Sequence, residues 1–180
     1  MSSKEYITRS FRIPKEYDDI LRDEANDIGQ SVNSIIDSII AKYVNNDRFY
    51  KNSQLLSLTP RTISSLLTML SDTEVVRAGK LAGGTSATDN LLMRGMSLDF
   101  DSLKWFIEEI MAKYADWFNC NYHRMNNMHM FHMRHGLGKK WSIFLQAYLE
   151  EMVKTILSLN TDAVISDTTI TLRIPINGIK

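Results

Sequence analysis

The stretch YITRSFRIP, residues 6–14, alternates apolar and polar side chains with the period of a β-strand. Alternation gives one face Ile7, Phe11 and Ile13, and the other face Tyr6, Thr8, Ser10 and Arg12. Pro14 cannot donate a hydrogen bond to a sheet, and its fixed φ suits the first turn of a helix. The sequence therefore predicts a short strand that ends at Pro14 and leads directly into a helix.

Two amphipathic helical patterns follow this strand and are separated at Gly29. Their apolar residues recur at spacings of three and four: Tyr17, Ile20, Leu21, Ala25 and Ile28, then Val32, Ile35, Ile36, Ile39, Ile40, Tyr43 and Val44. Gly29 suits the left-handed residue that ends the first helix, and Ser31 suits the N-cap of the second. A module of about 45 residues cannot bury this much apolar surface alone, so a homodimer formed through the strand and both helices is expected.

The spacing of these signals resembles the ribbon-helix-helix superfamily, which includes the Arc, methionine and plasmid copy-number repressors. The matching positions are Pro14, Glu16, Tyr17, Leu21, Ala25, Gly29 and Ser31. In that family two strands pair antiparallel across the dimer axis and enter the major groove of double-stranded DNA. The resemblance implies that residues 1–46 form a ribbon-helix-helix DNA-binding domain.

The resemblance also implies which residues contact DNA. The outward side chains Thr8, Ser10 and Arg12 are expected to read bases. The phosphate contacts are expected from Lys4 and Arg9 and from the start of the second helix, at Ser31, Val32, Asn33 and Ser34. Residues 1 to 48 hold seven Lys and Arg against nine Asp and Glu, a net charge of −2, so affinity is expected to depend on dimers or tetramers that occupy repeated half-sites.

The whole chain has 180 residues, with 21 basic and 21 acidic side chains, which leaves room for one further domain of ordinary size. Its single cysteine, Cys120, excludes an internal disulfide and fits a reducing cytoplasm. No apolar run is long enough for a membrane span, and the N-terminus has no hydrophobic signal segment. We therefore expect a cytoplasmic protein with no membrane partner, a linker at residues 47–57 and a sensing or oligomerisation domain at residues 58–180.

The second domain is expected to have βαββαβ order. After a helix capped by Thr59 and Pro60, the predicted elements are a strand at 73–81, a helix at 101–118, a hairpin at 119–134, a helix at 138–159 and a strand at 168–174. A helical insertion at 82–100 interrupts the first connection. The fold class is thus α+β, with a ferredoxin-like second domain. This layout resembles the regulatory domain of nickel-responsive repressors, which implies ligand sensing and tetramer assembly.

All four histidines and the only cysteine lie close together in the sequence, at Cys120, His123, His129, His132 and His135. Imidazole and thiolate are ligands for zinc, nickel and copper. If Asn126 and Asn127 form a two-residue hairpin turn, alternation separates Cys120 and His129 from His123 and His132. One face then retains a candidate metal set of His123, Met130 and His132. The alternative is a methionine-rich sheet whose faces pack against helices and another subunit.

A second candidate site is the loop before the helix at 138–159, where Gly136, Gly138, Lys139 and Lys140 stand at a helix N-terminus. Such a loop can receive an anionic effector, although glycine-containing loops before helices are also commonly structural. No nucleophile elbow, phosphate loop or metalloprotease motif is present, so we expect no enzyme activity and no certain cofactor.

These patterns predict a DNA-binding transcriptional regulator of the repressor type that reads inverted repeats. The alternative is an antitoxin that represses its own operon and binds a protein partner through its C-terminal part. Antitoxin tails commonly fold only on binding, whereas residues 59–174 carry the apolar stripes of a stable core, which favours the regulator.

Overall fold

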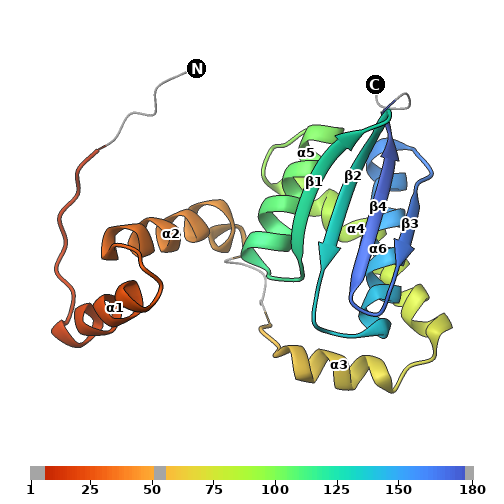
Figure 1. Cartoon of the computed structure of the whole chain (residues 1–180). Coiled ribbons are helices and arrows are strands. Elements are labelled where there is room, and N and C mark those ends of the chain that lie inside the picture. Colours follow the sequence, from red (N-terminus) through yellow and green to blue (C-terminus); the bar gives the residue numbers. More distant parts are fainter. Residues whose placement is uncertain (1–6, 51–55, 177–180) are drawn as a thin grey trace. The chain divides into compact units, whose positions relative to one another are not determined.

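The computed structural model describes residues 7–50 and 56–176, and the chain divides into two compact units, Met1–Arg48 and Phe49–Lys180 (Figure 1). The first unit contains helices α1 (Lys15–Asp27) and α2 (Val32–Asn45). A short 3-10 helix, η1 (Asp47–Tyr50), crosses the boundary between the units. Part of the predicted 47–57 linker is therefore helical, and residues 51–55 of it lie outside the described residues.

The turn between α1 and α2 has the predicted chemistry. Gly29 adopts a φ of +65°, which an L-residue with a side chain rarely tolerates. The Ser31 side chain accepts a hydrogen bond from the Ser34 amide at 3.1 Å and caps α2. Both predicted helices and their connecting turn are thus confirmed.

The predicted strand at residues 6–14 is not observed. Residues 7–14 have neither helix nor strand, and Tyr6 lies outside the described residues. A β-strand needs a neighbouring strand to satisfy its backbone groups, and the described part of this unit contains no other strand. Alternation alone therefore cannot make residues 7–14 a strand within one chain.

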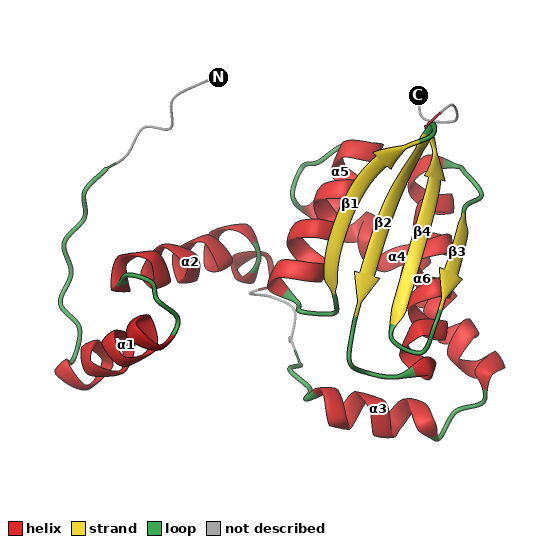
Figure 2. Ribbon diagram, in the orientation of Figure 1, coloured by secondary structure: helices red, strands yellow, loops and turns green. Residues whose placement is uncertain are grey.

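The second unit is a four-stranded antiparallel sheet covered by helices on one face (Figure 2). Its elements are α3 (Pro60–Thr68), α4 (Asp72–Met93), α5 (Phe100–Trp105), β1 (Asn119–Met125), β2 (Met128–Arg134), α6 (Lys139–Leu157), β3 (Asp162–Ile165) and β4 (Thr169–Pro175). The helix of α5 continues as a π-helix, η2 (Phe106–Tyr114). The strand order is β1-β2-β4-β3. The predicted hairpin and the elements near 59, 101–118, 138–159 and 168–174 are confirmed.

The βαββαβ order is wrong, although the α+β class holds. The predicted strand at 73–81 and most of the insertion at 82–100 form one helix, α4, whereas β3 was not predicted. A capping box between Ser71 and Glu74 starts α4. Gly83 and Gly84 do not end the helix, because the close packing of α4 against α6 outweighs their low helix propensity.

Glycine is required where α4 touches α6. A Cβ atom on Gly79 would lie 2.5 Å from the carbonyl oxygen of Phe144, and one on Gly83 would overlap the carbonyl oxygen of Tyr148. Gly84 is on another side of the helix, where a Cβ would meet only the Glu151 side chain at 3.7 Å. Gly79 and Gly83 therefore allow α4 and α6 to approach closely.

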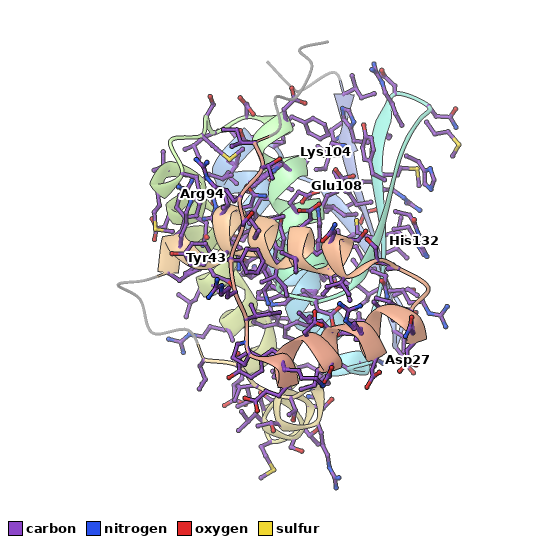
Figure 3. All side chains as sticks on the ribbon, turned by 90° about the vertical axis from the view of Figure 1, so that its left-hand side faces the viewer. Asp27, Tyr43, Arg94, Lys104, Glu108 and His132 are labelled. Atoms are coloured by element: carbon purple, nitrogen blue, oxygen red, sulfur yellow. The ribbon has the colours of Figure 1, made fainter. Side chains whose placement is uncertain are left out.

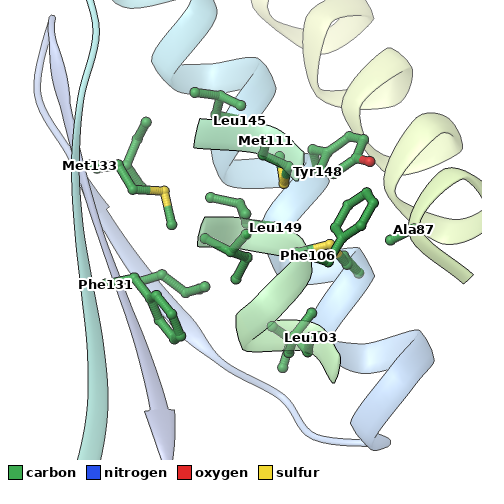
Figure 4. Packing of buried hydrophobic residues seen from close by; sticks show 14 of the residues in the cluster. Ala87, Leu103, Phe106, Met111, Phe131, Met133, Leu145, Tyr148 and Leu149 are labelled. Atoms are coloured by element: carbon green, nitrogen blue, oxygen red, sulfur yellow. The ribbon is translucent and has the colours of Figure 1, made fainter. Parts of the chain in front are cut away.

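The core of the second unit lies between this helical layer and the inner face of the sheet (Figure 4). Fully buried side chains meet there from each layer, including Leu103, Phe131, Met133, Leu145, Tyr148 and Leu149. Ile170, Leu172 and Ile174 of β4 complete the inner face of the sheet. The opposite face of the sheet carries the more exposed residues of the same strands.

Candidate functional site

The side chains predicted to read bases lie in the segment before α1. Thr8, Ser10 and Arg12 are all exposed, as is Arg9, and Lys4 lies outside the described residues. Neither arginine forms an ion pair with a described residue, whereas Lys15 and Arg22 on α1 pair with Asp19 and Asp18 at 2.7 and 2.6 Å. Among the described residues, therefore, no carboxylate is paired with the guanidinium groups of this segment.

The apolar residues of the same segment are also exposed. Ile7, Phe11 and Ile13 have 69%, 61% and 37% of their surface accessible. The helices behind them expose further large apolar residues: Tyr17, Ile20, Ile28, Ile39, Ile40 and Val44. Among residues 7–48, the buried apolar side chains are those of Ala25 and Ile35. Apolar surface on this scale marks a contact surface for another molecule.

The start of α2 offers fewer amides for a phosphate than the sequence suggested. The Ser34 amide donates to the Ser31 Oγ, and the two hydroxyls lie 2.9 Å apart. The amides of Val32 and Asn33 belong to the first turn, where no intrahelical acceptor exists. Four residues at this helix start were predicted to contact phosphate. The cap leaves the amides of Val32 and Asn33 for that contact.

The hairpin of β1 and β2 has the predicted register. Asn126 and Asn127 adopt φ values of 49° and 62°, Met125 pairs with Met128, and His123 pairs with Met130. The inner face carries Cys120, Tyr122, His129, Phe131 and Met133. The outer face carries Asn121, His123, Met125, Met130 and His132. The cysteine and the histidines thus separate between the two faces, as the alternation predicts.

The inner-face groups are held in structural contacts. The Tyr122 hydroxyl lies 2.7 Å from His129 Nδ1, and the His129 ring packs 3.7 Å from the centre of the Phe100 ring. Burial lowers the pKa of His129, which keeps the imidazole neutral, and burial raises the pKa of the Cys120 thiol to about 12. Cys120 is consequently a protonated thiol at neutral pH and a poor metal ligand or nucleophile.

Lys104 and Glu108 accompany this inner-face group, although sequence analysis did not identify them. The Lys104 ammonium lies 2.8 Å from the Glu108 carboxylate, and both residues are labelled in Figure 3. The same ammonium lies 4.5 Å from the centre of the Tyr122 ring. The hydrogen bond to Glu108 raises the pKa of Lys104. The i,i+4 spacing of the two residues on a helix was the available signal.

The candidate metal residues share the outer face. His123 and His132 are exposed, and Met130 is half-buried, paired with His123 across the strands and two positions before His132 on β2. His132 Nδ1 lies 3.1 Å from the Thr171 hydroxyl. Residues 7–50 and 56–176 contain no group of three or more His, Cys, Asp or Glu side chains that could hold a metal ion. His123 and His132 therefore do not belong to a site of three imidazole, thiolate or carboxylate ligands within these residues.

The loop at 136–140 is tied to the helical layer. Lys140 Nζ donates to an Asp72 carboxylate oxygen at 2.6 Å and to the Leu70 carbonyl at 2.8 Å, and this contact lowers the pKa of Asp72. Ser64 Oγ donates to the Leu137 carbonyl at 2.8 Å. Gly136 and Lys139 are exposed, and Gly138 caps α6 with a φ of +78°. Of the two lysines predicted to receive an anion, Lys140 already pairs with a carboxylate.

An aromatic cluster that sequence analysis missed lies where the second unit begins. The Arg94 guanidinium stands 4.4 Å from the centre of the Phe49 ring and 5.9 Å from that of Trp105. The Tyr50 hydroxyl donates to the Asn90 side-chain oxygen at 2.5 Å. These contacts fix the end of η1 to α4 and α5. The pair Phe49 and Tyr50 in an otherwise polar stretch was the only signal in the sequence.

Comparison with protein-family models, curated proteins and solved structures found no match to this chain. Within the described ranges, every helix is too short or too polar to cross a membrane.

Proposed function

We propose that this protein is a DNA-binding transcriptional regulator of the repressor type that acts as a homodimer. Two copies of residues 7–14 would pair as an antiparallel ribbon and enter the major groove. The observation that carries the proposal is the exposure of Ile7, Phe11 and Ile13 in a segment whose apolar and polar residues alternate in the sequence. A second copy of the same segment supplies the strand partner that a single chain lacks.

Pairing of the ribbons explains the distribution of residues in the first unit. The exposed isoleucine and aromatic side chains of residues 7–13 would pack on the apolar stripes of α1 and α2. Thr8, Ser10 and Arg12 would then point outward. The Arg12 guanidinium can form two hydrogen bonds with guanine, and the hydroxyls of Thr8 and Ser10 can bond to either base of a pair. Arg9 and the amides of Val32 and Asn33 would contact phosphates.

The second unit supports a regulator more than an antitoxin. An antitoxin tail that folds on its toxin has little core of its own. The unit observed here instead buries a continuous apolar cluster that involves α4, α6 and three of the four strands. In the proposed function this unit assembles dimers into larger oligomers or senses an effector.

Selection from a pool of random double-stranded DNA tests the proposal directly. The full-length protein should enrich a palindromic motif, and Arg12→Ala should weaken binding to that motif by about 1–3 kcal/mol and relax the preference at one position of each half-site. Arg61→Ala removes another exposed arginine, on α3, and should leave the motif unchanged. Failure of the full-length protein to enrich any motif, with or without added metal ions, would refute the proposed function.

A further inference from the structure

The outer face of the β1–β2 hairpin gathers sulfur and imidazole side chains. We call His123, Met125, Met128, Met130 and His132 the methionine–histidine cluster. His123 and Met130 are directly paired across the strands, as are Met125 and Met128. Side chains paired in this way have Cβ atoms about 5 Å apart, close enough to share one ion. His132 follows Met130 by two positions and so projects from the same face of the sheet.

The cluster is accessible to solvent. His123 and His132 are exposed, and Met125 has 55% of its surface accessible. Thioethers at core positions fill gaps between other apolar groups, as Met133 does on the inner face, where it is fully buried. The outer-face methionines Met125, Met128 and Met130 are not part of that core cluster. Met128 and Met130 are half-buried, so both side chains are partly accessible on the outer face.

His132 is oriented for ligation. Its Nδ1 lies 3.1 Å from the Thr171 hydroxyl on the adjacent strand β4. Metal-binding histidines commonly use one ring nitrogen in such a contact, which fixes the ring and leaves the other nitrogen for the metal. Nε2 of His132 is therefore the atom that would bind the metal ion in this arrangement.

The charges around the cluster decide which ion it suits. Arg173 stands beside Met130 in the register, and Arg134 follows His132 on β2 by two positions. Asp162 of β3 pairs with Arg173 in the sheet. Its carboxylate lies 3.6 Å from the Arg173 guanidinium, which partly neutralises it. Neutral ligands with cationic neighbours disfavour hard divalent ions such as Mg²⁺ and Ca²⁺, which need carboxylate oxygens. Thioether and imidazole together favour a soft monovalent ion.

We propose that the methionine–histidine cluster binds one copper(I) ion through His123, Met130 and His132, with Met128 as the neighbouring thioether. Thr171 is a positioning residue that acts through His132. Cys120 takes no part, because it lies on the inner face as a protonated thiol. The proposal does not depend on DNA binding, since all of these residues lie within the second unit.

Anaerobic titration of the full-length protein with copper(I), in competition with the chromogenic chelator bicinchoninate, tests the site. The experiment uses a Cys120→Ala background so that the thiol contributes nothing. One equivalent of copper per chain should leave the chelator. Met130→Leu and His132→Gln should each weaken the affinity at least about tenfold, and Thr171→Val should weaken it about tenfold through loss of the orienting contact.

A matched control replaces a methionine elsewhere. Met69→Leu alters a methionine that is 85% exposed on the α3 side of the unit and should leave copper affinity unchanged. Circular dichroism of each variant should match that of the parent, since every altered side chain is at least partly exposed. Copper X-ray absorption should show sulfur and nitrogen ligands, and the sulfur contribution should fall in Met130→Leu.

Two results would overturn the site. Retention of all copper by the chelator would show that the cluster does not bind the ion. Equal copper affinity in the parent and Met130→Leu, or zinc(II) binding as strong as that of copper(I), would show that no thioether selects the metal. These results are independent of the DNA selection, which can succeed or fail in the same protein preparation.

Discussion

Helices α2 and α6 are both amphipathic, yet their apolar stripes have opposite environments. Leu145 and Leu149 of α6 are fully buried, whereas Ile39 and Ile40 of α2 are more than half exposed. The second unit has a sheet and other helices against which α6 packs. In the described part of the first unit, α2 has only α1 and a segment without secondary structure beside it in the chain. The same periodicity therefore produces a completed core in one unit and a contact surface in the other.

The largest effect is expected from truncation in the completed core. Phe131→Ala removes a ring that is fully buried in the inner face of the sheet, and should lower the free energy of unfolding of the second unit by about 3–5 kcal/mol. All three tryptophans, Trp105, Trp117 and Trp141, lie in this unit, so their fluorescence reports its unfolding in denaturant. Asn121→Ala on the outer face should lower the free energy of unfolding far less. Equal decreases in the two variants would contradict the assigned core.

The exposed surface of the first unit should behave differently. Phe11→Ser should remove about 1.5–3 kcal/mol of burial from each chain of the proposed dimer, and so raise its dissociation constant by at least about tenfold. Sedimentation over a range of protein concentrations measures this change. Thr8→Ala, on the polar face of the same segment, should leave the dimer intact. An unchanged dimer in Phe11→Ser would show that the ribbon is not the contact.

A smaller effect is expected where α4 touches α6. Gly83→Ala places a methyl group against the Tyr148 carbonyl and should destabilise the second unit by about 1–3 kcal/mol. Gly84→Ala adds the same methyl group where space exists, and should stabilise α4 by about 0.5–1 kcal/mol. Denaturant unfolding of the two variants measures both. If both substitutions changed the free energy of unfolding in the same direction, the close contact between α4 and α6 would be contradicted.

The smallest effect concerns acidity and is confined to the second unit. Burial lowers the pKa of both His129 and His135, and His135 Nε2 lies 2.9 Å from the Ser142 hydroxyl. The unfolded chain therefore binds protons at a higher pH than the folded unit does, so stability is complete above the ordinary histidine pKa of about 6.5 and falls as the pH drops below it.

Tryptophan fluorescence in denaturant between about pH 7.5 and pH 5 measures this loss. His135→Gln should flatten the profile, whereas His123→Gln, which changes an exposed histidine, should leave it unchanged. A profile that stays flat in the parent protein would show that these histidines gain protons equally well in the folded state.

Local signals in the sequence were sufficient for several elements. Gly29 and Ser31 determined the turn between α1 and α2, Thr59 and Pro60 determined the start of α3, and Asn126 with Asn127 determined the hairpin and its two faces. Each of these signals acts within a few residues, through a φ preference or a cap. The outer-face placement of the methionine–histidine cluster followed from the same hairpin register.

Only the tertiary structure determined α4, β3 and the environment of each stripe. Residues 73–81 were predicted as a strand and residues 82–100 as an insertion, yet packing against α6 makes Asp72–Met93 one helix. β3 has four residues and forms by pairing with β4 and by a hydrogen bond from Gln146 to the Ala163 carbonyl. These features depend on contacts between residues far apart in the chain, and sequence periodicity carries no information about which partner is present.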